Sequence, residues 1–252
     1  MKVTSQRFSE IRWIEETGST NRDLLDAATE GRPAGSVLVT DHQTAGRGRQ
    51  GRTWLDDPGR SLLFSVLLRP EADRTSVLPL VMGMAVVDAI RKVSSVPAVL
   101  KWPNDVLVVD ADGSERKLAG ILAEAVTTAD GLAVVVGCGI NVAFVTGPPN
   151  EVRDRAIDLV SAASAPVDRA VLLEAILGAL DHWLDLLDRA GAEAIIEEYR
   201  DRCVTLGRVV TLETPAGVVT GTAVDIDPSG GLVLEVEGER RTLFAGDAHH
   251  QR

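Results

Sequence analysis

The sequence predicts an α+β fold, with a mixed-sheet main domain followed by a small β-barrel. Short apolar runs typical of strands are separated by turn signals such as DADGS and TTADG through the first half of the chain. Amphipathic runs typical of helices then fill residues 167–203. After Cys203 the pattern changes to short alternating strands punctuated by TPAG, DPSGG and EGE, as in a small barrel of about 45 residues. We therefore expect two domains, at 1–204 and 205–252.

The elements follow in order. STNRDLLDAATEG (19–31) predicts a short helix, because Thr20 with Asp23 three residues later forms a capping pattern and Gly31 ends the run. A second helix is expected from Thr75 to Ser94, where apolar residues recur at helical spacing. Strands are expected at 36–42, 61–70, 98–102, 105–110, 117–126 and 132–142. Helices at 167–190 and 192–203 close the domain.

The composition excludes several classes of protein. A formal net charge of -11 disfavours duplex DNA binding, which needs a broad basic face. No apolar run has the length of a signal peptide or of a bilayer span, so we expect a cytoplasmic protein without a membrane partner. Cys138 and Cys203 are expected to be free thiols, and the histidines have no zinc-site spacing. His249 and His250 are expected to lie in a solvated tail.

Residues 46–52 read GRGRQGR, a concentration of arginine that is unusual in an acidic chain. Glycines let backbone N–H groups approach an anion, while guanidinium groups bind carboxylate or phosphate oxygens in pairs. The loop therefore predicts a site for clustered negative charge. A flexible turn and an RNA-binding segment remain alternatives. Gly46, Gly48 and Gly51 also fit the G-x-G-x-x-G pattern of dinucleotide sites, but a strand follows where that pattern needs a helix.

Two further motifs lie near predicted strand ends. KWPND (101–105) and KLAG (117–120) bring two lysines and a carboxylate into one hairpin system, and GCGIN (137–141) offers close backbone approach to a ligand. The alternatives are a core tryptophan, a turn and a β-bulge. The intervening VVDADGSERK is expected to be an exposed hairpin tip without a role. His42 is expected to be a partly exposed structural histidine.

Taken together and in this order, STN (19–21), QTAGRGRQGRTW (43–54), KWPND, KLAGIL (117–122) and GCGIN resemble the biotin protein ligase family. The resemblance covers about residues 12–250. It implies a mixed-sheet catalytic domain of the biotin/lipoate ligase type and a C-terminal SH3-like barrel. Such enzymes join biotin to ATP, giving biotinyl-5′-adenylate and pyrophosphate, and then transfer the biotinyl group to a lysine of a carrier domain.

The resemblance also assigns residues. Arg49 and Lys117 would stabilise the junction of carboxylate and phosphate, and Asp105 would remove a proton from the acceptor amine or orient it. Biotin binding would involve Ser19, Thr20, Asn21, Gln43, Gly46, Arg47, Gly48, Arg49, Lys117 and Gly120. ATP and adenylate binding would involve Arg47, Arg49, Arg52, Trp54, Lys101, Asn104, Lys117, Gly139 and Asn141. For individual members the alternatives are a surface lysine at Lys117, a helix cap at Thr20 and a core side chain at Trp54.

Mg²⁺ is implied by the ATP and would be held by phosphates and water, with no metal site built from protein side chains. The implied partner is the biotin carboxyl carrier domain of an acyl-CoA or pyruvate carboxylase, and the protein would be a monomer or weak homodimer. About a dozen residues precede the first motif, so we expect no winged helix and no direct DNA binding. Lipoate ligation and a non-catalytic biotin- or anion-binding module are the alternative functions.

Overall fold

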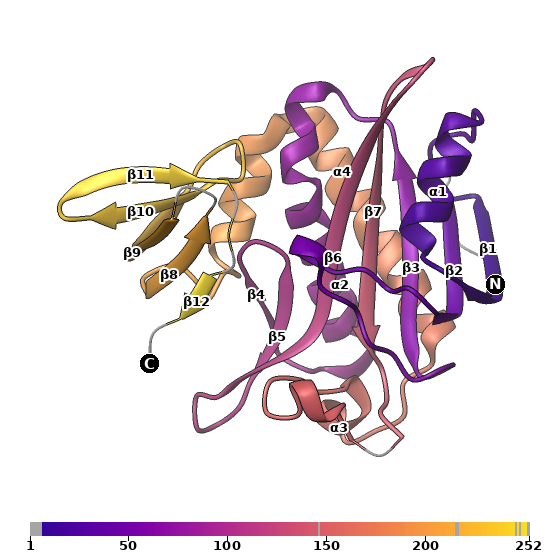
Figure 1. Ribbon diagram of the computed structural model, residues 1–252, viewed down its shortest axis with the longest axis horizontal. Coiled ribbons are helices and arrows are strands. Elements are labelled where there is room, and N and C mark those ends of the chain that lie inside the picture. The colour runs from indigo at the N-terminus through magenta and orange to yellow at the C-terminus, as the bar shows by residue number, and fades with distance from the viewer. Residues whose placement is uncertain (1–6, 146, 215–216, 245, 247, 251–252) are drawn as a thin grey trace.

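The computed structural model describes residues 7–145, 147–214, 217–244, 246 and 248–250. They form a seven-stranded mixed sheet and, beside it, a five-stranded antiparallel sheet (Figure 1). The predicted α+β architecture is confirmed. No helix among the described residues is long and apolar enough to cross a bilayer.

The seven-stranded sheet has the order β1-β2-β3-β7-β6-β5-β4, and only the β1–β2 pair is parallel. Its strands are β1 (Glu10–Thr17), β2 (Ser36–Gln43), β3 (Ser61–Leu68), β4 (Ala98–Lys101), β5 (Asp105–Val109), β6 (Glu115–Thr128) and β7 (Gly131–Asn141). Every residue of β3 is buried because the sheet is covered on both faces.

Helices α2 (Leu78–Ser94) and α4 (Arg169–Arg200) pack together on one face of this sheet, and α1 (Thr20–Thr29) packs on the other (Figure 1). The main core lies between the sheet and the α2–α4 layer, where Trp102, Phe64 and Tyr199 are fully buried. A smaller cluster under α1 includes Leu24 and Leu38. The remaining short helices are η1 (Arg49–Gly51), η2 (Ala72–Val77), η3 (Asn150–Val152) and α3 (Leu159–Ala163).

The predicted cap of the first helix is wrong. Ser19, in extended conformation, is the N-cap, and Thr20 is the first helical residue. The Thr20 hydroxyl lies 2.7 Å from Ser65 Oγ and 3.2 Å from Gln43 Oε1. Asp23 accepts a hydrogen bond from Thr17 at 2.6 Å. The capping pattern therefore located the helix, but both of its side chains bind residues outside the helix.

Other elements differ from the prediction in detail. Strand β1 was not predicted, because this half-exposed edge strand carries four charged residues among eight and has no apolar run. Helix α2 begins at Leu78, since residues 72–77 form the 3₁₀ turn η2. In α4, Gly191 has φ 79°, which interrupts the helix at the point where the sequence predicted a break between two helices.

The five-stranded sheet has the order β11-β10-β9-β8-β12. Its strands are β8 (Val209–Thr214), β9 (Gly217–Ile226), β10 (Leu232–Val236), β11 (Glu239–Leu243) and β12 (Ala248–His250). Residues 202–204, which lead into it, run along the outer edge of β4: Leu100 N donates to Arg202 O at 2.9 Å, and Val204 N donates to Leu100 O at 2.8 Å. The connection between the two sheets is thus itself hydrogen-bonded to the first.

A polar joint, formed by Glu115, Arg208, His250 and Thr205, links the two sheets. Glu115 Oε2 lies 2.9 Å from His250 Nδ1, and the same carboxylate pairs with Arg208. His250 Nε2 lies 3.2 Å from Thr205 Oγ1. Two expectations are corrected here: only 6% of the His250 side chain is exposed, so it is no solvated tail, and the β5–β6 hairpin has a role because its Glu115 is held in this joint.

Candidate active site

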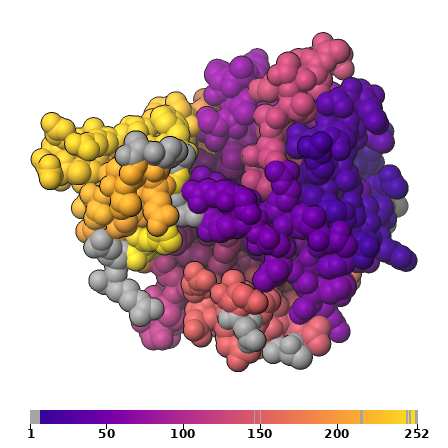
Figure 2. Space-filling view, in the orientation of Figure 1, coloured from indigo at the N-terminus to yellow at the C-terminus, as the bar shows by residue number. Residues whose placement is uncertain are grey.

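A cavity of about 430 Å³ opens where the arginine loop (residues 44–60) passes in front of β6 and β7. This volume lies in the range of ligand pockets for small molecules. In Figure 2 the violet atoms of the loop cross the middle of the visible face, between the main sheet and the yellow C-terminal strands. Its walls contain every predicted site residue except one, Gly46.

The arginine loop is a hairpin with its own hydrogen bonds. Trp54 N donates to Gly46 O at 3.0 Å, Arg47 and Thr53 form an antiparallel bridge, and Gly48 N donates to Arg52 O at 2.6 Å. Gly46 supports this hairpin without lining the cavity: a Cβ there would lie 2.6 Å from Trp54 O. The tip turns through Gln50 and Gly51, both with positive φ.

Three cationic side chains of the cavity, Lys117, Arg47 and Arg49, have acidic or polar partners within the protein. Lys117 Nζ lies 2.6 Å from Asp105 Oδ1, and Arg47 Nη1 lies 2.9 Å from Glu124 Oε1. Arg49 Nη1 donates to Asn104 Oδ1 at 3.1 Å. An anionic ligand can therefore exchange with these partners, and the cations are held in place before it arrives.

Polar groups converge at the N-terminus of α1. Gln43 Oε1 accepts from Thr20 N at 2.9 Å, while Ser65 Oγ donates to Asn21 Oδ1 at 2.7 Å. Asn21 Nδ2 donates to Leu122 O and Glu124 Oε2. Among the described hydrogen bonds none uses Gln43 Nε2, so this amide can donate to a ligand.

Three glycines leave room on the cavity side of β6 and β7. A Cβ on Gly139 would lie 2.5 Å from the Trp54 ring, and one on Gly120 would lie 2.8 Å from it. A Cβ on Gly137 would lie 2.1 Å from Asn21 Oδ1. The indole of Trp54 therefore lies flat against the strands, and its Nε1 is buried without a hydrogen-bond partner among the described residues.

The remaining predicted residues lie around Lys117. Its Nζ is 5.7 Å from the centroid of the Trp54 ring. Asn141 donates to Lys117 O and Ile157 O, so its amide oxygen is the atom left for a ligand. Asn104 Nδ2 donates to Ile121 O at 2.9 Å. Lys101 and Arg52 line the same cavity.

Sequence reasoning missed Ser65 and Glu124. Both lie within strands, and Ser65 is fully buried between apolar neighbours. Glu124 could have been found, because it places a carboxylate inside the apolar run KLAGILAEAV. A charge within a strand needs a partner, so this residue was a candidate for a polar site. Burial raises the pKa of Cys138, another wall residue, well above its ordinary value, so this thiol stays neutral.

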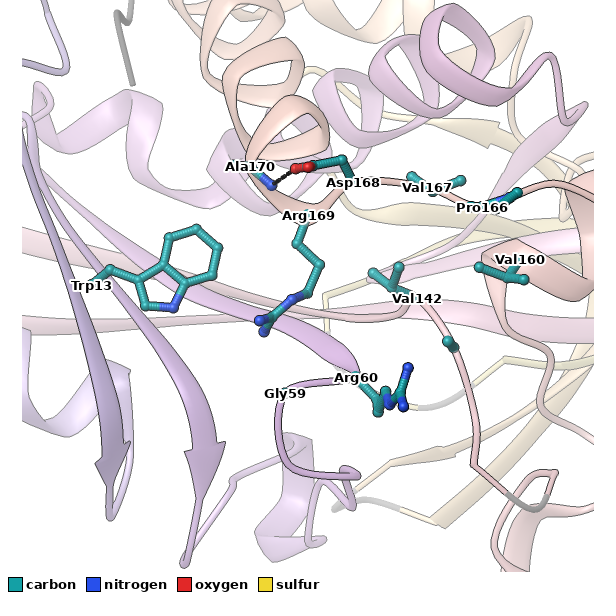
Figure 3. A pocket seen from close by; sticks show the side chains of 11 residues that line it. Trp13, Gly59, Arg60, Val142, Val160, Pro166, Val167, Asp168, Arg169 and Ala170 are labelled. Carbon is teal, nitrogen blue, oxygen red and sulfur yellow. Dashed lines mark hydrogen bonds between the residues drawn. The ribbon is translucent and has the colours of Figure 1, made fainter.

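A second cavity, of about 470 Å³, lies at the start of α4 (Figure 3). Arg169 points into it between Trp13 and Arg60, with its guanidinium carbon 5.2 Å from the centroid of the Trp13 ring. Its Nη1 also pairs with Asp41 at 2.8 Å, and Asp168 caps the helix through Ala170 N and Val171 N. These charges secure the end of β2 and the start of α4.

Among the described residues no three His, Cys, Asp or Glu side chains gather as metal ligands.

Comparison with known proteins gives consistent results. Residues 13–141 match the biotin/lipoate A/B protein ligase family, and residues 205–250 match the biotin protein ligase C terminal domain. The chain is 39% identical to a biotin--[acetyl-CoA-carboxylase] ligase of Mycobacterium tuberculosis, over 95% of this chain and 88% of that protein. A protein of the same name from Paracoccus denitrificans is 31% identical, over 93% and 98%. The structure of a biotin protein ligase from Aquifex aeolicus in complex with biotin and ATP superposes with a TM-score of 0.82 at 31% identity, covering 97% of this chain and all of that one.

Proposed function

This chain belongs to the biotin/lipoate A/B protein ligase family, and on that premise we propose that it activates biotin with ATP and transfers the biotinyl group to a lysine of a carrier protein. The observation that carries the proposal is one cavity that joins the arginine loop, Lys117 and Asp105. Relatives and solved structures named for biotin favour biotin over lipoate.

In the first step a carboxylate oxygen of biotin attacks the α-phosphorus of ATP, and the bond to pyrophosphate breaks. Both reactants are anions, so the step needs fixed positive charge where they meet. We assign that charge to Arg49 and Lys117, with Arg47 and Arg52 beside them. Mg²⁺ would neutralise part of the phosphate charge.

In the second step the acceptor lysine nitrogen attacks the acyl carbonyl, an amide bond forms, and AMP leaves. A lysine is almost wholly protonated at neutral pH and must lose a proton first. Asp105, on the cavity wall, is assigned to take that proton or to orient the amine. Its present partner Lys117 would then be bound by the phosphate.

The ligand contacts are assigned by position. Ser19, Thr20, Asn21 and Gln43, with Gly48 of the loop and Gly120, would surround the biotin rings, whose ureido group needs donors and acceptors. Gly46 would act through the hairpin and not by contact with biotin. Trp54, Lys101, Asn104, Gly139 and Asn141 would surround the nucleotide.

We also propose that the catalytic domain comprises residues 1–204 and an SH3-like domain residues 205–252. The acceptor would be the biotin carboxyl carrier domain of an acyl-CoA or pyruvate carboxylase. We propose further that the protein is a cytoplasmic monomer or weak homodimer that binds neither DNA nor membranes directly. The net charge of -11 supports the absence of direct DNA binding.

Pyrophosphate release from Mg-ATP by the purified protein, with biotin, with lipoate and with neither, tests the function. Release that depends on biotin, followed by labelling of a carrier domain, is expected. Release with lipoate alone would overturn the biotin assignment, and binding of biotin without any release would identify a non-catalytic module.

A further inference from the structure

The base of the arginine loop contains a side-chain pair that takes no part in the proposed reaction. His42 lies at the end of β2, next to the cavity residue Gln43, and Asp56 follows Trp54 by two residues. His42 Nδ1 lies 2.9 Å from Asp56 Oδ2. We infer that this pair is a positioning device that holds the arginine loop over the reactive adenylate; the inference rests on the proposed function.

The carboxylate of Asp56 is buried, so the structure of the loop depends on its pairing with His42. Only 1% of the Asp56 side chain is exposed, compared with 29% of His42. A shielded carboxylate is costly unless it is paired, and His42 is the side chain that pairs with it. The pair therefore keeps residue 56 against the end of β2.

The pair also has the right place in the hairpin. Toward the tip of the hairpin lie the Gly46–Trp54 and Gly48–Arg52 backbone hydrogen bonds. They position Arg47 and Arg49 at the cavity. On the other side of the pair, Gly59 N donates to Asp41 O at 2.8 Å. The His42–Asp56 pair therefore lies between the hydrogen bonds of the hairpin and the Gly59–Asp41 hydrogen bond at the base of the loop.

The β2 side of the pair is rigidly held. Asp41 accepts from Trp13 Nε1 at 2.9 Å and from Arg169 at 2.8 Å. Both donors line the second cavity (Figure 3). With residue 41 fixed, loss of the pair releases the Asp56 side of the loop. The Trp54 indole and the arginines would then move away from the cavity, and the mixed anhydride would become open to water and to foreign amines.

The first test measures partition of the intermediate. His42→Ala and Asp56→Asn are compared with wild type and with Arg49→Gly, which removes the hydrogen bonds from the loop to Asn104 and Gly246. His182→Gln, at an exposed position, is the surface control. The readout is biotin transferred to an added bystander protein per pyrophosphate released. We expect this ratio to rise about tenfold in His42→Ala, as for loss of a hydrogen bond to a charged group. Asp56→Asn should show a smaller rise because no charge is left buried.

A purely structural role would lower pyrophosphate release and leave the ratio unchanged, and that result would overturn the inference. The double variant His42→Ala with Asp56→Asn should leak no more than the His42→Ala single variant, since both substitutions act through one contact. If the increases in leakage of the two single variants add up in the double variant, the two residues do not act through one contact.

A second readout does not need activity. Trypsin should cleave the ligand-free variants after Arg47, Arg49 or Arg52 faster than wild type, with unchanged cleavage elsewhere. Equal cleavage in the loop would overturn the inference even if the protein is a biotin ligase. Absence of pyrophosphate release in wild type, with faster loop cleavage in the variants, would instead reject the proposed function and keep the pair as the anchor of the loop.

Discussion

At the scale of single residues, two cations of the site, Lys117 and Arg47, already form ion pairs within the protein. Lys117 Nζ lies 2.6 Å from Asp105 Oδ1, and both residues line the cavity. In the mechanism that we propose, each partner acts in a different step, so one ion pair would serve the two half-reactions in turn. Binding of phosphate to Lys117 would make the carboxylate of Asp105 available to the acceptor amine.

Lys117→Ala should therefore lower the rate of the first half-reaction by about 100-fold, the usual effect of removing one group that stabilises transition-state charge. The measurement is biotin-dependent pyrophosphate release at saturating Mg-ATP. Lys92→Ala, an exposed position on α2, serves as the control. A rate within twofold of wild type in Lys117→Ala would reject the assignment.

The sequence indicated which residues gather around this cavity, and the reason is physical. Arginine and glycine interleaved in GRGRQGR, and the lysines and acid of KWPND and KLAG, are residue types that a folded core does not need at such density. Ser65 and Glu124 escaped because each lies alone in an apolar strand, where a serine or a single acid has many ordinary explanations. Gly46 was placed in the right loop, but its role is in the hairpin.

At the scale of elements, the close packing of β6 and β7 against Trp54 depends on glycine. Cβ atoms on Gly120 and Gly139 would both lie within 3 Å of the indole ring. These two strands therefore form a flat floor on which an aromatic side chain, or the ligand beside it, can lie.

Gly139→Ala should displace the Trp54 ring and lower the free energy of unfolding by about 1–3 kcal/mol, the cost of overpacking. The matched control is Gly178→Ala in α4, where a Cβ meets nothing within 4 Å. That change should stabilise the protein by about 0.5–1 kcal/mol because alanine favours helix. Urea unfolding measures the change in the free energy of unfolding of both variants. Changes of the same sign in the two variants would contradict the prediction.

Helix α4 depends on its N-cap. Asp168 accepts from Ala170 N at 2.7 Å and from Val171 N at 3.1 Å. Asp168→Ala should therefore cost about 1 kcal/mol of stability. Val171→Ala, at an exposed position of the same turn, should change stability by less than about 0.5 kcal/mol. Thermal unfolding measures both; an unchanged Tm in Asp168→Ala would show that the cap contributes nothing.

The elements that sequence reasoning missed share one property. Strand β1 and helix α3 carry no strong apolar period, and their residues are ordered by what they pack against. The strands from β2 to β7 were predicted because their apolar runs are bounded by turns. The first helix was located correctly, but its N-cap was not, since the decisive partners Gln43 and Ser65 are distant in sequence.

At the scale of the whole molecule, the two sheets are connected by a buried polar joint as well as by the chain. Burial lowers the pKa of His250 below its usual 6.5 although Glu115 opposes the shift, and Lys101 and Arg208 lower it further. The folded protein therefore holds this histidine neutral near pH 7. As the pH falls through the unfolded-state pKa, the unfolded chain gains the proton first, and stability is lost.

The Tm should accordingly decrease between about pH 7.5 and pH 5.5, and His250→Gln should flatten this dependence. His249→Gln, the exposed neighbour, should keep the wild-type slope. Thermal unfolding across this range provides the measurement. A wild-type slope in His250→Gln would show that other groups govern the acid sensitivity.

The chain segment along β4 has a consequence for solution behaviour. An open sheet offers unpaired backbone groups at its outer strands, and such edges recruit other chains into aggregates. Residues 202–204 already occupy the β4 edge with two hydrogen bonds. The other edge, β1, presents Glu10, Arg12, Glu15 and Glu16 as exposed charges. The β4 edge is thus protected by backbone hydrogen bonds within the chain, and the β1 edge by electrostatic repulsion, so acid or high salt would weaken the protection only at β1.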